Sequence, residues 1–312
     1  MSDRVRYVDI VAGIMILWMI VQHAIQSAWF LDPCQPTNFY GCNPNVWFPY
    51  VNFFMPWFFY KSGYFFKKDT IKKLWQKDWN KLIKVLIIWS AIGYLCYILL
   101  GCITNTITLH DALYTPTRRF FLTGYIAMNA PLWFLLTLVG VRFVSNIILP
   151  CHLNKWSHHL QCLIIVMVSS LIAFSDHVIN CPLIPRWVAN GASGLAFFTL
   201  GYWLRDYEQE LALIILAILG YAYNCFFGWN IVNMHLNVLM EGCYILWFPA
   251  ALCGIVLFNN VFRVLCEWMG KKYPPPLFVL RFVRNDWQIC HANIRNAFIC
   301  TLPDTHHIRE CE

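Results

Sequence analysis

Two ionisable side chains lie in the first long apolar run of the chain, where ionisable groups are costly. The run, Asp9–Phe30, is long enough to cross a bilayer and contains Asp9 and His23. A neutral imidazole can take up a proton near neutral pH, so His23 is the first candidate for general-base chemistry. If the run is one helix, His23 lies about 21 Å along the axis from Asp9. The two side chains therefore cannot touch, and Asp9 is no direct partner of His23.

Helical periodicity predicts how this run is oriented. At about 100° per residue, the polar positions share one stripe of the helix, which consists of Asp9, Gly13, Ile16, Ile20, His23 and Ser27. We expect this stripe to face the protein interior, while the other Ile, Leu, Trp and Met side chains face lipid. The alternatives are a packing role for His23, held by hydrogen bonds, and pairing of Asp9 with a nearby basic residue.

A pair of lysines before the third apolar run is the second candidate for chemistry. Lys81 and Lys84 are three positions apart, so a helix places them on one side. Ammonium groups there are suited to binding phosphate groups, and snorkelling toward lipid head groups is an equally weighted alternative. The preceding segment, 67–81, interleaves lysines with Trp75 and Trp79 at helical spacing. It is expected to lie along the inner membrane surface, or to act only as a topological anchor.

Membrane-spanning helices are the elements that must position these residues. Hydrophobic residues make up 59% of the sequence and charged residues 12%, and the apolar residues are gathered in repeated runs. This pattern predicts an all-α polytopic transmembrane bundle of about eight to ten spans. The expected spans are 9–30, 51–66, 82–103, 131–149, 162–174, 192–204, 211–229 and 244–258, with a ninth and a tenth left open.

The distribution of charge predicts the orientation of the bundle. The net charge is +7, but Lys and Arg concentrate in alternate connections between the apolar runs. This asymmetry is typical of cytosolic loops, and it predicts a multi-pass protein of the inner or plasma membrane with a cytosolic N-terminus. The same explanation removes the reason to expect nucleic acid as a partner.

Cysteines and the remaining histidines suggest little chemistry. The 14 cysteines are scattered singly, without a CxxC pair. Cys34 and Cys42 share a polar loop, and the sequence leaves open whether they form a disulfide in an oxidising compartment. His152, His158 and His159 share another loop, and no acidic residue stands near them at ligand spacing. We therefore expect no metal site.

Four stretches of the chain carry a family resemblance. They are RYVDIVAGIMILWMIVQH, FFMPWFFYKSGYFFKK, NKLIK and PLWFLLTL, and SGLAFFTLGYWLRD fits as a later helix. In this order they resemble the acyltransferase 3 family of membrane O-acyltransferases, particularly its fucose 4-O-acetylase-like branch. The resemblance covers roughly residues 4–270. It implies a membrane domain at 1–270, followed by a divergent or truncated C-terminal segment at 271–312.

The resemblance also implies an activity and its site residues. It implies transfer of an acetyl or other acyl group from acetyl-CoA to a hydroxyl of a sugar in surface polysaccharide or exopolysaccharide. The catalytic residues would be His23 and Asp9. The residues that it implies for the donor are Lys81, Lys84, Ser62, Gly63 and Tyr64. The residues for a sugar or acyl pocket are Trp133, Phe134, Phe58 and Phe59.

Alternatives stay open for these residues and for the function. Ser62 and Gly63 also permit close packing of two helices, and the aromatic residues also serve as interfacial anchors. A transporter or exporter component would use His23 and Asp9 to line a solute or proton path. An inactive family relative is the third possibility, because Ala12 stands where the family has a basic residue. For the enzyme, the expected partners are the sugar acceptor, the acyl-CoA donor and the lipid bilayer.

Overall fold

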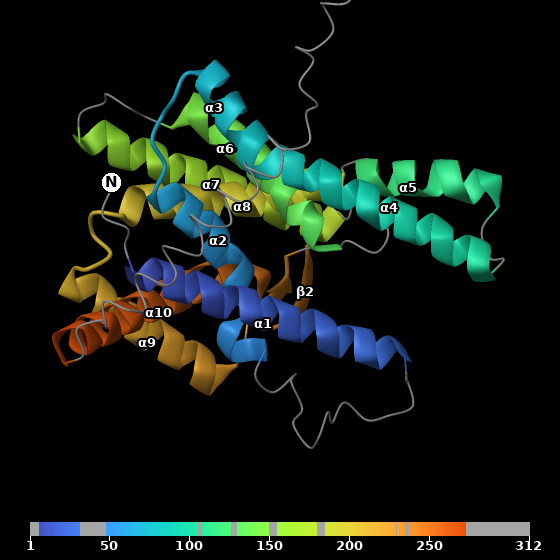
Figure 1. The fold of residues 1–312 in the computed structure, drawn as a ribbon. Helices are drawn as coiled ribbons and strands as arrows, with labels where there is room; N and C mark the ends of the chain where they lie inside the picture. The colour runs from blue at the N-terminus through green and yellow to red at the C-terminus, as the bar shows by residue number, and fades with distance from the viewer. Residues whose placement is uncertain are drawn as a thin grey trace, which may run out of the picture. The chain divides into compact units, whose positions relative to one another are not determined.

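The computed structural model describes residues 6–31, 48–104, 108–125, 130–149, 155–179, 185–228, 230–234 and 237–272. Most of these residues are helical (Figure 1). The α-helices are α1 (Arg6–Leu31), α2 (Phe54–Tyr64), α3 (Ile71–Asp78), α4 (Lys84–Thr104), α5 (Leu109–Thr123), α6 (Trp133–Ile148), α7 (Lys155–Ile179), α8 (Arg186–Leu204), α9 (Leu211–Phe227) and α10 (Tyr244–Lys272). The shorter helical turns are η2 (Phe48–Val51), η3 (Trp79–Ile83) and η4 (Ala130–Leu132). The strands β1 (Ile231–Asn233) and β2 (Val238–Glu241) form an antiparallel pair.

Residue contacts divide the chain into two units after Asn260, within α10. The described part of the second unit is the end of α10, where Arg263 pairs with Glu267 at 4.0 Å. The fold and the sites described below belong to the first unit. The predicted boundary at residue 270 was based on the extent of the family resemblance, and it stays a prediction.

Three helical stretches of the described chain are long and apolar enough to cross a membrane. They are Ile71–Thr104, Trp156–Ile179 and Tyr244–Trp268. Shorter apolar helices are Tyr7–Val21, Trp133–Ile148 and Leu211–Phe227. The predicted helical class is confirmed, and these lengths and compositions suit association with a membrane.

The predicted basic segment and the third expected span form a single helix. Ile71–Thr104 is continuous over 34 residues, and α3 passes into α4 through the π turn η3. The sequence pattern predicts a surface segment at 67–81 before a span that begins at 82. No proline or glycine interrupts residues 71–92, so the helical hydrogen bonding continues through the boundary.

The core is organised around α8, which is buried along most of its length and packs against α2, α6 and α7. Glycines set the distance between α2 and α8. A Cβ atom on Gly63 would lie 1.8 Å from the carbonyl oxygen of Phe198. A Cβ atom on Gly201 would lie 2.0 Å from the carbonyl oxygen of Tyr60. The two backbones are therefore in direct contact at two points, each of which requires glycine.

Helix α1 forms as predicted but buries a different face. Its buried side chains include Val8, Val11 and Met15, at helical spacing, and α1 packs against α2. The described part of the predicted inward stripe faces away from the core, since the exposed residues are Asp9, Gly13, Ile16 and Ile20. The predicted orientation is wrong because a row of apolar side chains packs against α2 without burying a carboxylate.

Candidate functional site

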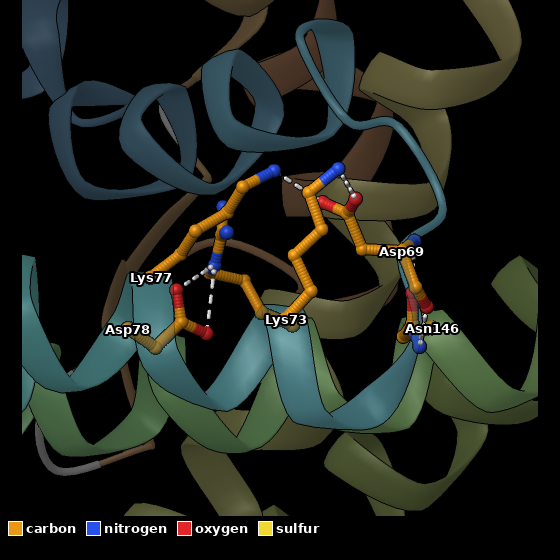
Figure 2. A network of polar contacts seen from close by, with 6 residues as sticks. Asp69, Lys73, Lys77, Asp78 and Asn146 are labelled. Carbon is orange, nitrogen blue, oxygen red and sulfur yellow. Dashed lines mark hydrogen bonds and ion pairs between the residues drawn. The ribbon is translucent and has the colours of Figure 1, made fainter.

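The connection between α2 and α3 is fastened to α6 by polar contacts. The backbone N–H of Asp69 donates to Oδ1 of Asn146 at 3.0 Å, and the Asn146 amide donates back to the Asp69 carbonyl at 2.9 Å. Figure 2 shows Lys73 and Lys77 extending from α3 toward the Asp69 carboxylate, with Lys73 Nζ 3.1 Å from Oδ1. The basic segment is therefore docked on the helical bundle through its own acidic residue.

The Asp69 contacts predict a dependence of stability on pH. Hydrogen bonding from Lys77 is the main influence and, against a smaller opposing effect of burial, holds the pKa of the Asp69 carboxyl below its ordinary value of 3.8. The carboxylate therefore stabilises the fold fully above that value, and the contribution disappears as the pH falls through the lower pKa of the folded state. Thermal midpoints of the wild type and of Asp69→Asn, measured in detergent across the acidic range, should differ near neutral pH and converge at low pH. A constant difference would contradict this assignment.

A separate ion pair joins α3 to α6. The Arg142 Nε atom donates to both carboxylate oxygens of Asp78, at 2.9 and 3.1 Å. The Asp78 side chain is 4% exposed and that of Arg142 is 23% exposed. A carboxylate at this depth depends on its counter-charge, because burial without one leaves the desolvation cost uncompensated.

Loss of the Arg142 charge should therefore destabilise the protein strongly. We expect Arg142→Met to cost roughly 3 kcal/mol, since it leaves Asp78 buried and unpaired. The double variant Arg142→Met/Asp78→Leu should recover most of this loss, because it removes the stranded charge as well. Denaturant unfolding of both variants in the same detergent provides the measurement. A double variant less stable than the single one would contradict the explanation.

The two lysines that the sequence assigns to the donor lie on the outside of this helix. Lys81 belongs to the π turn and Lys84 begins α4, and both are exposed. Neither forms a hydrogen bond or an ion pair with another residue of the described ranges. The π turn changes the angle between them from that of a regular α-helix. They remain available to an anionic group. The exposed rings of Trp75 and Trp79, on the same continuous helix, lie 6.2 Å apart between centroids.

A cleft lies at the C-terminal end of α2, where α1, α2, α10 and the turn after α8 meet. Its cavity volume is about 10 Å³, enough for about one water molecule, and the space including its open mouth is about 210 Å³. Aromatic and polar side chains dominate the lining, which consists of Tyr7, Val8, Trp57, Tyr60, Lys61, Tyr64, Phe65, Glu208 and Asn259. Among the predicted site residues whose side chains the structure describes, Tyr64 is the one that lines this cleft.

A buried carboxylate forms one wall of the cleft. Glu208 is 2% exposed, and the Asn259 amide donates to its Oε1 at 2.6 Å. The Trp57 indole N–H donates to Oδ1 of Asn259 at 2.8 Å, and the Asn260 amide donates to the Glu208 carbonyl at 3.0 Å. Nearby, the Lys61 ammonium lies 5.1 Å from the centroid of the Trp57 ring. The cleft thus combines a fixed acceptor, a cation and several aromatic surfaces.

Sequence reasoning missed Glu208 because it follows Arg205 and Asp206, in a stretch that has the composition of a solvated helix end. The signal that could have found it lies elsewhere. Asn259 and Asn260 are adjacent amides in an apolar helix, where unpaired polar groups are costly. Such a pair indicates a buried polar partner from another element.

Four of the five predicted donor residues do not line the cleft, Ser62 and Gly63 among them. Gly63 is occupied by the backbone contact with α8, and Ser62 beside it is half-buried. Gly63 therefore serves close packing of two helices, which was the alternative to a role in binding the donor. Tyr64 lines the cleft, and so does Lys61, whose unusual position in an apolar segment is visible in the sequence.

The four predicted pocket aromatics are brought together, but as a packed group. The Phe134 ring lies 5.7 Å from Phe58, 5.0 Å from Phe59 and 6.2 Å from Trp133, measured between ring centroids. Phe59 and Trp133 are buried, whereas Phe58 and Phe134 are half-buried. Phe59 also covers Gly194, where a Cβ atom would lie 2.7 Å from its ring. Only the half-buried pair has surface left for a ligand.

The predicted catalytic residues lie on one helix. Asp9 is exposed in the first turn of α1, where the helix dipole favours an acid. His23 lies on the same continuous helix, which supports the expected separation along the axis, but its side chain lies outside the described residues. Cys34 and Cys42 also lie outside them, so their pairing stays a prediction.

The histidines of the α7 region hold partners within the protein. The Trp203 indole N–H donates to Nδ1 of His159 at 2.7 Å, and the Tyr207 hydroxyl lies 3.5 Å from its Nε2. His158 packs against Tyr202, and His152 is outside the described residues. The described part of the chain contains no group of three or more His, Cys, Asp or Glu residues placed to hold a metal ion.

Comparison with family models, curated proteins and solved structures found no match. The function proposed below therefore rests on the chain's own residues and on the resemblance of its sequence stretches.

Proposed function

We propose that the chain is a membrane-embedded O-acyltransferase that moves an acetyl or other acyl group from acyl-CoA to a sugar hydroxyl of surface polysaccharide or exopolysaccharide. The observation that carries the proposal is the cleft at the end of α2. Two of the stretches that resemble the acyltransferase 3 family meet there, next to a residue that follows the later stretch. Tyr7 and Val8 come from the first stretch. The second stretch contributes Trp57, Tyr60, Lys61, Tyr64 and Phe65, and Glu208 lies two residues after the end of the later one.

Charge supports placement of the acyl-CoA donor at this end of the bundle. The start of α1, the end of α2 and the start of Ile71–Thr104 carry most of the basic residues that predict a cytosolic side. In the proposed topology of about eight to ten spans with a cytosolic N-terminus, the cleft opens toward the compartment that holds acetyl-CoA. Lys61, Lys81 and Lys84 would bind its phosphates, and Tyr64 would contact the chain that bears the thioester.

The proposed reaction requires one proton acceptor. The sugar hydroxyl oxygen attacks the thioester carbonyl carbon, and the hydroxyl proton passes to the His23 imidazole. The carbon–sulfur bond then breaks, an ester forms, and the thiolate of coenzyme A takes the proton from the imidazolium. Asp9, about 21 Å from His23 along the helix, takes no part in this proton transfer. Its proposed role is at the donor end of α1.

The direct test is the acetyl content of the surface glycans. Mass spectrometry of glycans from cells with and without the gene should show loss of ester-linked acetyl groups in the deletion strain. Wild-type chain should restore them, and the double variant Lys81→Ala/Lys84→Ala should restore them less well at equal protein level. Unchanged acetylation in the deletion strain would contradict the proposed acyltransferase function. It would favour a transporter or an inactive relative.

A further inference from the structure

A second polar cluster lies where α7 ends and α10 begins. The Asn237 amide donates to Oδ2 of Asp176 at 2.8 Å and to the Ala173 carbonyl at 3.0 Å. The Arg186 guanidinium lies 3.7 Å from the same Asp176 oxygen, and the Tyr244 hydroxyl donates to Oδ1 of Asn237. Asn237 has a positive φ of 52°, so these bonds hold a backbone conformation that few residues adopt. Groups from α7, α8, α10 and the β1–β2 connection are thereby fixed to one another.

The cluster orients the imidazole of His177. Its Nδ1 atom lies 3.2 Å from the Asn237 carbonyl oxygen. A carbonyl oxygen only accepts hydrogen bonds, so Nδ1 carries the proton, and Nε2 of the neutral ring is an acceptor. The ring stacks on Tyr244 with centroids 4.7 Å apart and an angle of 11° between the planes. His177 is half-buried, and no residue of the described ranges donates to its Nε2.

A second hydrogen-bond acceptor, the Asp176 carboxylate, belongs to the residue before His177 in the sequence. The Asp176 side chain is 4% exposed, yet its Oδ1 atom has no hydrogen-bond partner among the described residues. A buried carboxylate oxygen without a donor is uncommon, and it is usually completed by a bound group or a water molecule. Two fixed acceptors, a neighbouring guanidinium and an aromatic ring form a set suited to hydroxyl groups.

We infer that His177 and Asp176, held in place by Asn237 and Arg186, bind the hydroxyl groups of a sugar, which is the acceptor of the proposed transfer. This inference rests on the proposed function and names the residues for its second substrate. One sugar hydroxyl donates to Nε2 of His177, and a second group completes Oδ1 of Asp176. In the proposed topology this end of the bundle faces away from the cytosol, on the side where surface polysaccharide lies.

The inference is tested by binding, without catalysis. Full-length protein in nanodiscs is titrated with methyl fucoside, followed by saturation-transfer NMR, with the per-O-methylated sugar as a probe that lacks hydroxyl donors. The wild type should bind only the unmethylated sugar. His177→Ala should weaken binding roughly tenfold, while His177→Gln, whose amide oxygen accepts, should retain part of it. His110→Gln, an exposed histidine on α5, should bind as the wild type does.

Three results would overturn the inference. They are equal binding by the wild type and His177→Ala, equal binding of the two sugars, and no binding by the wild type. Thermal midpoints verify that His177→Ala and His177→Gln are folded. With an active enzyme, His177→Ala should raise the KM for the sugar and leave the KM for acyl-CoA unchanged. Failure of the glycan test with intact sugar binding would remove the proposed reaction but leave a sugar-binding site.

Discussion

Replacing Gly63 with alanine is expected to destabilise the protein by about 3 kcal/mol, at the upper end of the cost of overpacking. The added Cβ atom would lie 1.8 Å from the carbonyl oxygen and 2.7 Å from the carbonyl carbon of Phe198. Both atoms belong to the backbone of α8, so no side chain can move aside. The helices must separate, which would also disturb the reciprocal contact of Gly201 with Tyr60.

A matched control is available on α6. Gly140 is also a helical glycine, but a Cβ atom there would meet nothing within 4 Å. Gly140→Ala should leave stability unchanged or raise it by up to about 1 kcal/mol through helix propensity. Thermal midpoints of both variants in the same detergent provide the comparison. Equal midpoints for Gly63→Ala and Gly140→Ala would show that α2 and α8 are not in direct backbone contact.

The separation of α2 and α8 should also affect the cleft. Tyr60 and Tyr64, which line it, flank Gly63 on α2. A variant that moves α2 therefore displaces one wall of the proposed donor site. If Gly63→Ala is folded at low temperature, acyl-CoA should bind more weakly to it than to Gly140→Ala.

Replacing His23 with alanine is expected to abolish sugar acetylation. A positioned general base contributes about 100-fold to 10,000-fold to the rate, and alanine leaves no group to take the hydroxyl proton. The substitution shortens one side chain on a continuous helix, so the protein should still insert in the membrane. Acetyl groups on the glycans and the amount of protein in the membrane fraction are both measured.

The His23 result can be separated from a general effect of losing a histidine. His110→Gln, on the exposed surface of α5, should acetylate at the wild-type level. His177→Ala should show the KM effect described above, whereas His23→Ala should lower kcat. Acetylation by His23→Ala at the wild-type level would remove His23 from the mechanism, and with it the main support for the family resemblance.

Several features were predictable from the sequence because they depend on local patterns. The apolar run after Arg6 forms one helix, as its composition predicts, and the following helices coincide in large part with the expected spans. The importance of the α2 stretch was also visible, since its unusual Lys61 and its neighbour Tyr64 both line the cleft. Helix formation in apolar runs needs no distant partner, so periodicity and length suffice.

Other features depend on which helices become neighbours, and the sequence does not contain that information in readable form. The periodicity of α1 permits more than one inward face, and packing on α2 selected Val8, Val11 and Met15 in place of the stripe with Asp9. The sequence is compatible with Gly63 contacting either a ligand or another helix. The structure places the backbone of Phe198 against it.

The cleft shows most clearly which features follow from the sequence alone and which depend on the tertiary structure. The sequence alone determined a helical, strongly apolar chain whose α2 stretch carries a cation and aromatic side chains in a distinctive order. Only the tertiary structure placed Glu208 against Asn259, 2.6 Å apart, from residues that are distant along the chain. The reason is physical, because the cost of burying a carboxylate is offset only by donors that folding brings from other helices.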